Sequence, residues 1–409
     1  MRRAINQDSF AVHLAETRER WQDCGHLFLV ADGMGAHAAG ELASKLATEL
    51  IPHQYLKASG APAETLHTSI TQANAEIFRR GQANIEFRSM GTTCSVLTLL
   101  PEGAVVAHVG DSRVYQVHGD HVFQLTFDHS LVWEMQAAGE VTDETARSGA
   151  IPKNVITRSL GPNANVQIDL EGPFPVRRGD CFLLCSDGLT GQVTDEELAM
   201  IMKSLPPEEA CQLLVDISNL RGGPDNITAV VVRVPNDHVT TSSNTSATLK
   251  RNGPKRKFSP ALGVVTAVCF SAALLLLLLG NMPLGIVTGT LGFVALATGL
   301  TQVLWQPSSN GNPSGRYGNG PYRQFPIKAG ADLVTKLGGT VESLREAAKE
   351  RGWKIDWKAL DDQLEKARKY QKAGDSRKAV AAAGRVVIDL MAQIRRQRND
   401  EASDSAVDL

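Results

Sequence analysis

Five aspartates in the first 235 residues each stand at the end of an apolar run or in a glycine turn. The clearest case is LFLVADGMGAHAAGE, residues 27–41, where apolar residues up to Ala31 predict a buried strand that ends at Asp32 and Gly33. A fixed carboxylate beside a carbonyl in a glycine turn is the arrangement that oxygen-preferring divalent cations bind. A lone Asp-Gly pair would indicate a solvated surface turn, but four more acidic turns follow.

The other four aspartates recur in the same setting. They are Asp8 in RRAINQD, Asp111 in GDSR, Asp187 in CSDG and Asp225 in GGPDN. Carboxylates that gather in one place repel one another, and burying them is costly unless a cation compensates their charge. We therefore expect these side chains, together with Asp32, to bind Mg²⁺ or Mn²⁺.

Apolar periodicity indicates which elements carry these residues. Several stretches have the 3.6-residue spacing of helices, and others are rich in Val, Leu and Thr between glycines, which is typical of strands in hairpins. This mixture, without strict alternation of strand and helix, favours an α+β domain with antiparallel sheets. The predicted helices include 38–50, 64–80 and 207–220, and the predicted strands include 91–100, 103–117 and 180–185.

The net charge of −2 hides an asymmetry along the chain. Residues 1–235 carry 18 Lys and Arg against 29 Asp and Glu, whereas residues 236–399 carry 24 against 11. The acidic balance of the first part argues against a nucleic-acid surface. The basic excess of the second part fits the cytoplasmic face of a membrane.

Six cysteines are scattered among apolar residues, and their spacing matches no zinc-ligand pattern. Free, buried thiols in a reducing compartment are therefore expected. No signal peptide is expected either, because the opening MRRAINQD has no apolar core.

Residues 258–315 contain no charged residue. Two segments, 261–280 and 284–305, are each about 20 residues long, enough to cross a hydrocarbon core of about 30 Å. We expect 258–305 to form a transmembrane hairpin in contact with lipid. Basic residues flank both outer ends, which predicts a multi-pass protein of the inner cell membrane with both ends cytoplasmic. A transporter or channel is a poorer interpretation, because the spans contain no ionisable residue.

Two polar stretches, 236–257 and 306–326, have the composition of linkers. Between the second linker and residue 398, apolar stripes predict a cytoplasmic helical domain, 327–398. Part of it resembles half of a tetratricopeptide hairpin, but a single copy is weak, and a small packed helical bundle is preferred. The acidic end, 399–409, is expected to be disordered.

Eight motifs follow one another in an order that resembles one known family: RRAINQD, DGMGAHAAGE, GTT, GDSRVY, TFDHS, NVITRSLG, CSDGLTG and GGPDNIT. They are similar to the motif series of the metal-dependent protein phosphatases, the type 2C serine/threonine phosphatase family in its bacterial form. The resemblance covers residues 1–235, the expected catalytic domain. It implies an antiparallel β-sandwich flanked by helix pairs, with two Mn²⁺ or Mg²⁺ ions in the cleft and a third, weaker ion.

The resemblance also implies metal ligands. Asp32 would bridge the two metals, and the Gly33 carbonyl would bind one of them. Asp187 and Asp225 resemble the remaining direct ligands, and Asp8 resembles a ligand that acts directly or through water.

Three further residues resemble functional positions of the family. Asp111 corresponds to the residue that helps to hold the third ion. Arg3 would bind the substrate phosphate, for which its planar fork of donors is suited, although outside its motif it would be taken for a solvated N-terminal arginine. His37 could serve as the general acid for the leaving oxygen, while a histidine in a polar turn is as well explained by ordinary hydrogen bonding.

The function expected from these residues is hydrolysis of phosphoserine and phosphothreonine in proteins, by direct attack of a metal-bridging hydroxide and without a phosphoenzyme. Phosphorylated proteins are the expected partners, with a serine/threonine kinase and its substrates among them. A second class stays open, a catalytically inactive metal-binding scaffold that recruits partners through its helical tail. The intact set of five aspartates with Arg3 favours the enzyme.

Overall fold

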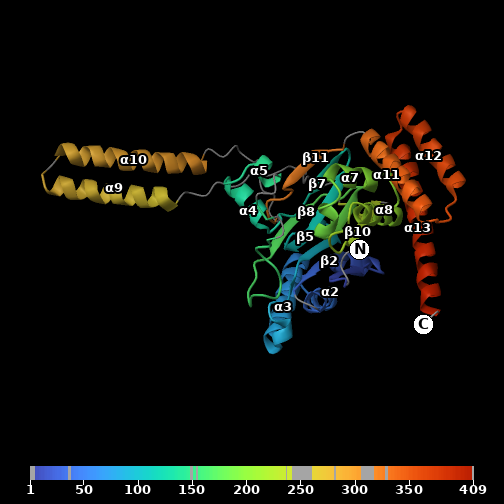
Figure 1. Ribbon diagram of the computed structural model, residues 1–409. Helices are drawn as coiled ribbons and strands as arrows, with labels where there is room; N and C mark the ends of the chain where they lie inside the picture. Colours follow the sequence, from blue (N-terminus) through green and yellow to red (C-terminus); the bar gives the residue numbers. More distant parts are fainter. Residues whose placement is uncertain are drawn as a thin grey trace. The chain divides into compact units, whose positions relative to one another are not determined.

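Two antiparallel sheets face each other in the computed structural model (Figure 1). The six-stranded sheet has the order β1-β2-β4-β5-β8, with β3 paired to β2, and the five-stranded sheet has the order β10-β9-β6-β7-β11. The strands are β1 (Asp8–His13), β2 (His26–Met34), β3 (Gly91–Thr92), β4 (Cys94–Leu100), β5 (Gly103–Val109), β6 (Arg113–His118), β7 (His121–Gln124), β8 (Asp169–Phe174), β9 (Cys181–Cys185), β10 (Ala229–Arg233) and β11 (Arg323–Pro326).

The chain divides into two compact units, Met1–Arg251 with Arg316–Leu409, and Asn252–Gly315. The residues that the structure describes are 5–35, 38–147, 151–152, 155–235, 237–241, 260–280, 282–304, 317–327 and 330–407.

Alternating side chains along the strands fill separate cores on the two faces of each sheet. In β2, Leu27 and Leu29 pack against helices α2 (Ala39–Lys57) and α3 (Pro62–Ala83), whereas Phe28 packs between the sheets. This two-residue period is what a strand covered on both faces requires. The expected α+β sandwich with flanking helices is confirmed.

Helices α7 (Asp195–Ser204) and α8 (Pro207–Leu220) cover the outer face of the five-stranded sheet, where Tyr115 and Leu183 belong to their core. A capping box, in which Thr194 and Glu197 each bond the other's backbone N–H, starts α7. The remaining elements of the larger unit before residue 251 are α1 (Arg18–Asp23), α4 (Leu131–Ala138), α5 (Asp143–Arg147), α6 (Asp187–Thr190), and the 3-10 helices η1 (Ile85–Phe87) and η2 (Asp237–Val239).

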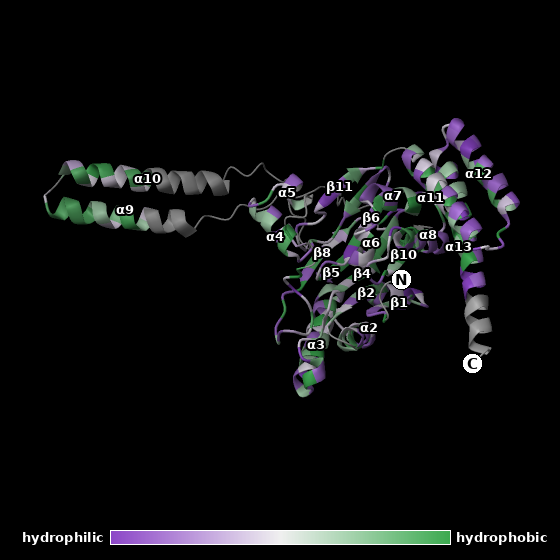
Figure 2. Cartoon of the chain, viewed as in Figure 1, coloured by the Kyte–Doolittle hydropathy of each residue, from purple (hydrophilic) through white to green (hydrophobic). Residues whose placement is uncertain are grey.

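The C-terminal bundle consists of α11 (Ala331–Glu350), α12 (Trp357–Lys372) and α13 (Ser376–Val407). Helix α13 packs against α7 and α8, and its Val387 and Leu390 are buried in the same core as the outer face of the five-stranded sheet (Figure 1). Helix α12 is mostly hydrophilic (Figure 2). The bundle expected at 327–398 therefore lies in the same compact unit as the sandwich.

Two stretches expected to lack regular structure have it. Residues 323–326, placed in a linker from their composition, form β11 and pair with the edge strand β7. Helix α13 continues to Val407, through most of the tail that was expected to be disordered. β11 takes its hydrogen bonds from β7, and the end of α13 continues a helix that begins at Ser376; composition alone indicates neither.

The smaller unit contains α9 (Pro260–Leu278) and α10 (Met282–Leu304), which pack against each other. Crossing a bilayer takes one helix of about 20 predominantly apolar residues. Within the described residues, none of the helices meets that requirement for length and apolar character. The predicted localisation, a multi-pass protein of the inner membrane with both ends cytoplasmic, is therefore wrong, and the lipid contact inferred from it has no support.

Candidate metal centre

The first two strands place Asp8 and Asp32 side by side. Asp8 begins β1 and lies directly opposite Asp32 of β2 in the antiparallel register. The backbone of Asp32 is fixed by the GTT motif: its N–H donates to Thr93 Oγ1 at 2.9 Å, and its carbonyl accepts from Thr92 Oγ1 at 3.0 Å. Thr92 and Thr93 therefore fix the backbone that carries the Asp32 carboxylate.

Two hydroxyl groups from the other sheet orient Asp8. Its Oδ2 accepts hydrogen bonds from Ser186 Oγ at 2.8 Å and Thr228 Oγ1 at 2.7 Å. Its Oδ1 is buried and has no hydrogen-bond partner among the described residues. The carboxyl groups of Asp8 and Asp32 repel each other when both are ionised, and a bound cation relieves that repulsion.

Asp187 and Asp225 come from two segments in close contact. Asp187 is the first residue of α6, and Asp225 lies in the turn between α8 and β10. A Cβ atom on Gly188 would lie 2.0 Å from the carbonyl oxygen of Asn226, so only glycine lets the two segments approach this closely. The Asn226 side chain also accepts a hydrogen bond from the N–H of Gln7 at 3.0 Å, which ties in the segment before Asp8.

The five aspartates share one electrostatic environment. Burial raises the pKa of Asp32 well above its ordinary value, and the charges of Asp8, Asp187, Asp111 and Asp225 raise it further. The pKa of Asp187 is raised by burial and then by the charge of Asp225. Burial, followed by the charge of Asp187, raises the pKa of Asp111 to about 7. The structure thus brings the five aspartates together around Asp32.

Buried carboxylate oxygens make this cluster chemically suited to a divalent cation. Asp111 Oδ1, like Asp8 Oδ1, is buried and has no donor among the described groups, and Mn²⁺ and Mg²⁺ prefer oxygen ligands. As they lie, no three His, Cys, Asp or Glu side chains in the described part of the chain are grouped closely enough to hold an ion. The charges of the other four aspartates nevertheless act on Asp32. The cluster fits the metal, and the assignment of individual ligands stays a prediction.

Gly33, Arg3 and His37 were also predicted to belong to the site. Gly33 follows Asp32 in β2 and donates its N–H to the Gln7 carbonyl at 3.1 Å. A Cβ atom there would lie 2.1 Å from the Gly40 carbonyl oxygen, so the position requires glycine. Arg3 and His37 lie outside the described residues. Their roles in phosphate binding and proton transfer stay predictions.

The hydroxyl residues that hold the aspartates were not singled out from the sequence. Thr93 and Ser112 share a hydrogen bond of 2.7 Å next to Asp32 and Asp111. Ser186 and Thr228 each donate a hydrogen bond to Asp8. Each of the four hydroxyl residues lies within one of the motifs GTT, GDSR, CSDG and GGPDNIT. A hydroxyl residue within three positions of an aspartate, or in the GTT turn, can donate a hydrogen bond that orients a carboxylate. This local pattern could have indicated the four residues from the sequence.

Comparisons with known proteins concern the first half of the chain and the sandwich. A model of the family described as protein phosphatase 2C matches residues 2–216. The serine/threonine phosphatase Stp of Listeria innocua is 36% identical over 212 residues, which cover 50% of this chain and 83% of that protein. The protein phosphatase PhpP of Streptococcus pneumoniae is 36% identical over 211 residues, 50% of this chain and 85% of that protein. A solved serine/threonine phosphatase from S. agalactiae superimposes with a TM-score of 0.51 at 32% identity, covering 57% of this chain and 95% of that one.

Proposed function

The chain belongs to the protein phosphatase 2C family, and on this premise we propose that its five clustered aspartates are the metal centre at which phosphate is removed from proteins. It is a serine/threonine protein phosphatase. Members of the family use Mn²⁺ or Mg²⁺, the ions expected from the sequence. The observation that carries the proposal is that Asp8 and Asp32 lie opposite each other in β1 and β2, while Ser186, the neighbour of Asp187, and Thr228 bond to Asp8.

The chain's own residues would divide the work as follows. When bound, Mn²⁺ or Mg²⁺ supplies a water activated for attack on phosphorus and positive charge beside the phosphoryl oxygens. Asp32, which the other four charges surround, would hold both ions. Ser186 and Thr228 occupy one oxygen of Asp8 and so leave only its Oδ1 for a metal or a metal-bound water. Asp187 of α6 and Asp225 of the turn before β10 would complete the centre.

The substrate side of the proposal rests on family resemblance. Arg3 would bind the phosphoryl oxygens through its planar guanidinium. His37 would donate a proton to the departing serine or threonine oxygen. The Asp111 carboxylate would help to hold a third, weaker ion. Phosphoserine and phosphothreonine proteins, made by a serine/threonine kinase, are the substrates that this arrangement fits.

The test is metal-dependent release of phosphate from a phosphothreonine peptide by the full chain, with Mn²⁺ and with excess EDTA. Asp32→Ala and Asp187→Ala should each lower turnover by about 10³-fold or more, because several kcal/mol of charge stabilisation are lost. Asp120→Ala is the matched control. This carboxylate is exposed in a turn and paired with Lys203, so its loss should leave turnover unchanged.

A protein that binds Mn²⁺ but releases no phosphate would contradict the proposal and favour the inactive scaffold. Activity that survives both Asp32→Ala and Asp187→Ala would move the site away from this cluster.

A further inference from the structure

Basic side chains of the C-terminal bundle meet acidic side chains of α7 and α8. In each of three ion pairs between described residues, the cation belongs to the bundle and the carboxylate belongs to α7 or α8. The pairs are Lys336 with Glu197 at 3.2 Å, Arg385 with Glu209 at 2.7 Å, and Arg395 with Asp216 at 2.5 Å. The charge difference between the two parts of the sequence is therefore used, in part, inside the molecule.

One of these acids leads further into the catalytic half. Glu197 is largely buried and binds the guanidinium of Arg221 through both oxygens, at 2.6 and 3.0 Å. Paired hydrogen bonds between a carboxylate and a guanidinium are directional and strong. Lys336 reaches the Oε1 atom of Glu197, the same oxygen that binds Arg221 Nη2. Glu197 therefore links Lys336 of the bundle to Arg221.

Arg221 connects the two segments that carry Asp187 and Asp225. Its Nη1 donates to the carbonyl of Gln192 at 2.6 Å, in the turn that follows α6, and Asp187 is the first residue of that helix. Arg221 itself ends α8, and the short glycine turn after it leads directly to Asp225. One side chain therefore joins both sources of ligand on this side of the cluster.

We infer that Arg221 is a positioning residue for the metal centre and that the C-terminal bundle acts on it through Lys336 and Glu197. The inference rests on the proposed function. Asp187 and Asp225 repel each other, so their segments must be held together before an ion can bind both. Residues that support ligands in this way affect metal affinity strongly although they do not touch the ion. A bundle that is displaced from α7 would weaken metal binding.

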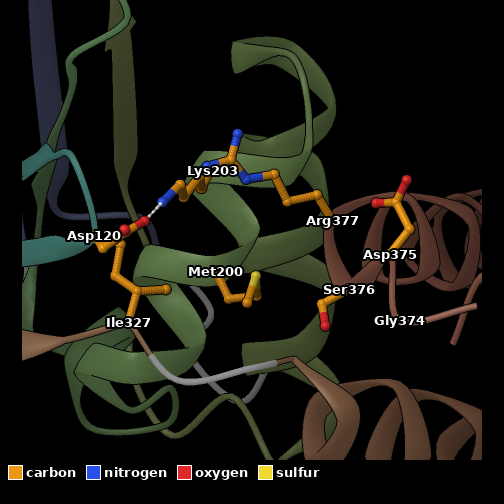
Figure 3. A pocket seen from close by; sticks show the side chains of 8 residues that line it. All are labelled: Asp120, Met200, Lys203, Ile327, Gly374, Asp375, Ser376 and Arg377. Atoms are coloured by element: carbon orange, nitrogen blue, oxygen red, sulfur yellow. Dashed lines mark hydrogen bonds and ion pairs between the residues drawn. The ribbon is translucent and has the colours of Figure 1, made fainter.

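The bundle also provides a matched control. A cavity of about 390 Å³ lies where α7 meets the start of α13, and Met200, Lys203 and Arg377 line it (Figure 3). The charge of Arg377 acts on Asp120 in this cavity, and among the described residues it makes no hydrogen bond or ion pair with Glu197 or Arg221. Arg377→Gln therefore removes a bundle cation next to the same helix but outside the connection to the centre.

The experiment measures the Mn²⁺ dissociation constant by titration calorimetry, with Mn²⁺ added to the full chain after EDTA has removed bound metal. Arg221→Gln should raise the Mn²⁺ dissociation constant by about tenfold, and Arg221→Lys, which keeps the positive charge on a single donor nitrogen, should recover part of the loss. Lys336→Gln should raise it by about two- to fivefold, since the lysine is half exposed. Arg377→Gln should leave it unchanged. The double variant Arg221→Gln with Lys336→Gln should bind Mn²⁺ no more weakly than Arg221→Gln alone.

Three results would overturn the inference. One is unchanged Mn²⁺ affinity in Arg221→Gln, with circular dichroism showing a folded protein. The second is additive losses in the double variant, since Lys336 would then act by another route. The third is an equal loss in Lys336→Gln and Arg377→Gln, which would point to general charge. A wild-type chain that binds no Mn²⁺ would instead overturn the proposed function itself. Lys336→Gln alters an exposed side chain, so it stays informative if Arg221→Gln does not fold.

Discussion

Two of the regions of the larger unit that contain buried acids differ in the charges placed beside them. In the metal centre, Asp8, Asp32 and Asp187 adjoin one another, and burial raises the pKa of each. In the interface between α7, α8 and the bundle, the acids adjoin cations. Burial alone would raise the pKa of Glu197, yet the hydrogen bonds and charge of Arg221 lower it. Asp216, fully buried, is paired with Arg395.

The two regions differ in whether the chain itself supplies the positive charges that balance the buried carboxylates. The interface carries its own counter-charges, so its acids contribute to cohesion whatever the solution contains. The centre gathers like charges, and only protons or added cations can relieve their repulsion. The basic excess after residue 235 was interpreted from the sequence as a membrane face. Three of those basic residues, Lys336, Arg385 and Arg395, form ion pairs in this interface.

Removing the bundle should produce the largest effect. A chain without residues 317–409 loses β11 and exposes the apolar side chains that α13 covers, and each fully buried Val or Leu contributes about 1.5–3 kcal/mol. Because a domain has only about 5–15 kcal/mol of stability in all, we expect this fragment to unfold or aggregate in urea titration. Replacing residues 252–315 by a flexible linker should leave the unfolding midpoint of the larger unit unchanged. A chain without residues 317–409 that is as stable as the full chain would show that the interface contributes no cohesion.

Neutralising one acid in each region should change stability in opposite directions. In EDTA at pH 7, Asp32→Asn should stabilise the protein by about 1 kcal/mol or more, because it removes repulsion. Asp216→Asn should destabilise it by about 1–2 kcal/mol, a discounted value because Arg395 reaches solvent. Urea unfolding of both variants measures the difference. With saturating Mn²⁺ the gain in Asp32→Asn should become a loss, since the variant forfeits metal binding. The same sign for both variants in EDTA would refute the contrast.

The pH dependence of stability should separate the regions by smaller amounts. Asp111 has a folded pKa of about 7 against an ordinary 3.8, so without metal the protein should lose stability as pH rises from about 4 to 7. Glu197 has a folded pKa below its ordinary 4.5, so its contribution should be present above that pH and lost as pH falls. Unfolding free energies measured from about pH 2 to 8 in EDTA and in Mn²⁺ test both. Mn²⁺ should abolish the loss toward neutral pH and leave the acid-side loss in place.

Particular residues show why some features could be predicted from the sequence. The apolar run before Asp32 and the glycine at Gly33 are local properties, so strand, turn and candidate ligand could all be inferred from neighbouring residues. Thr194 and Glu197 likewise mark the start of α7 as a capping box. The two uncharged segments did form helices α9 and α10, but counting uncharged residues led to a membrane span that the described helices do not provide.

The sequence by itself determined many of the strands, most of the helices, the five aspartates and the family, because these depend on local periodicity and on motifs in a fixed order. Only the tertiary structure decided that Ser186 and Thr228 orient Asp8, that residues 323–326 extend a sheet, and that the bundle covers α7 and α8. These features join residues far apart in the chain, as Lys336 and Glu197 are. No local pattern specifies such pairs, since each partner alone has the appearance of an ordinary surface charge.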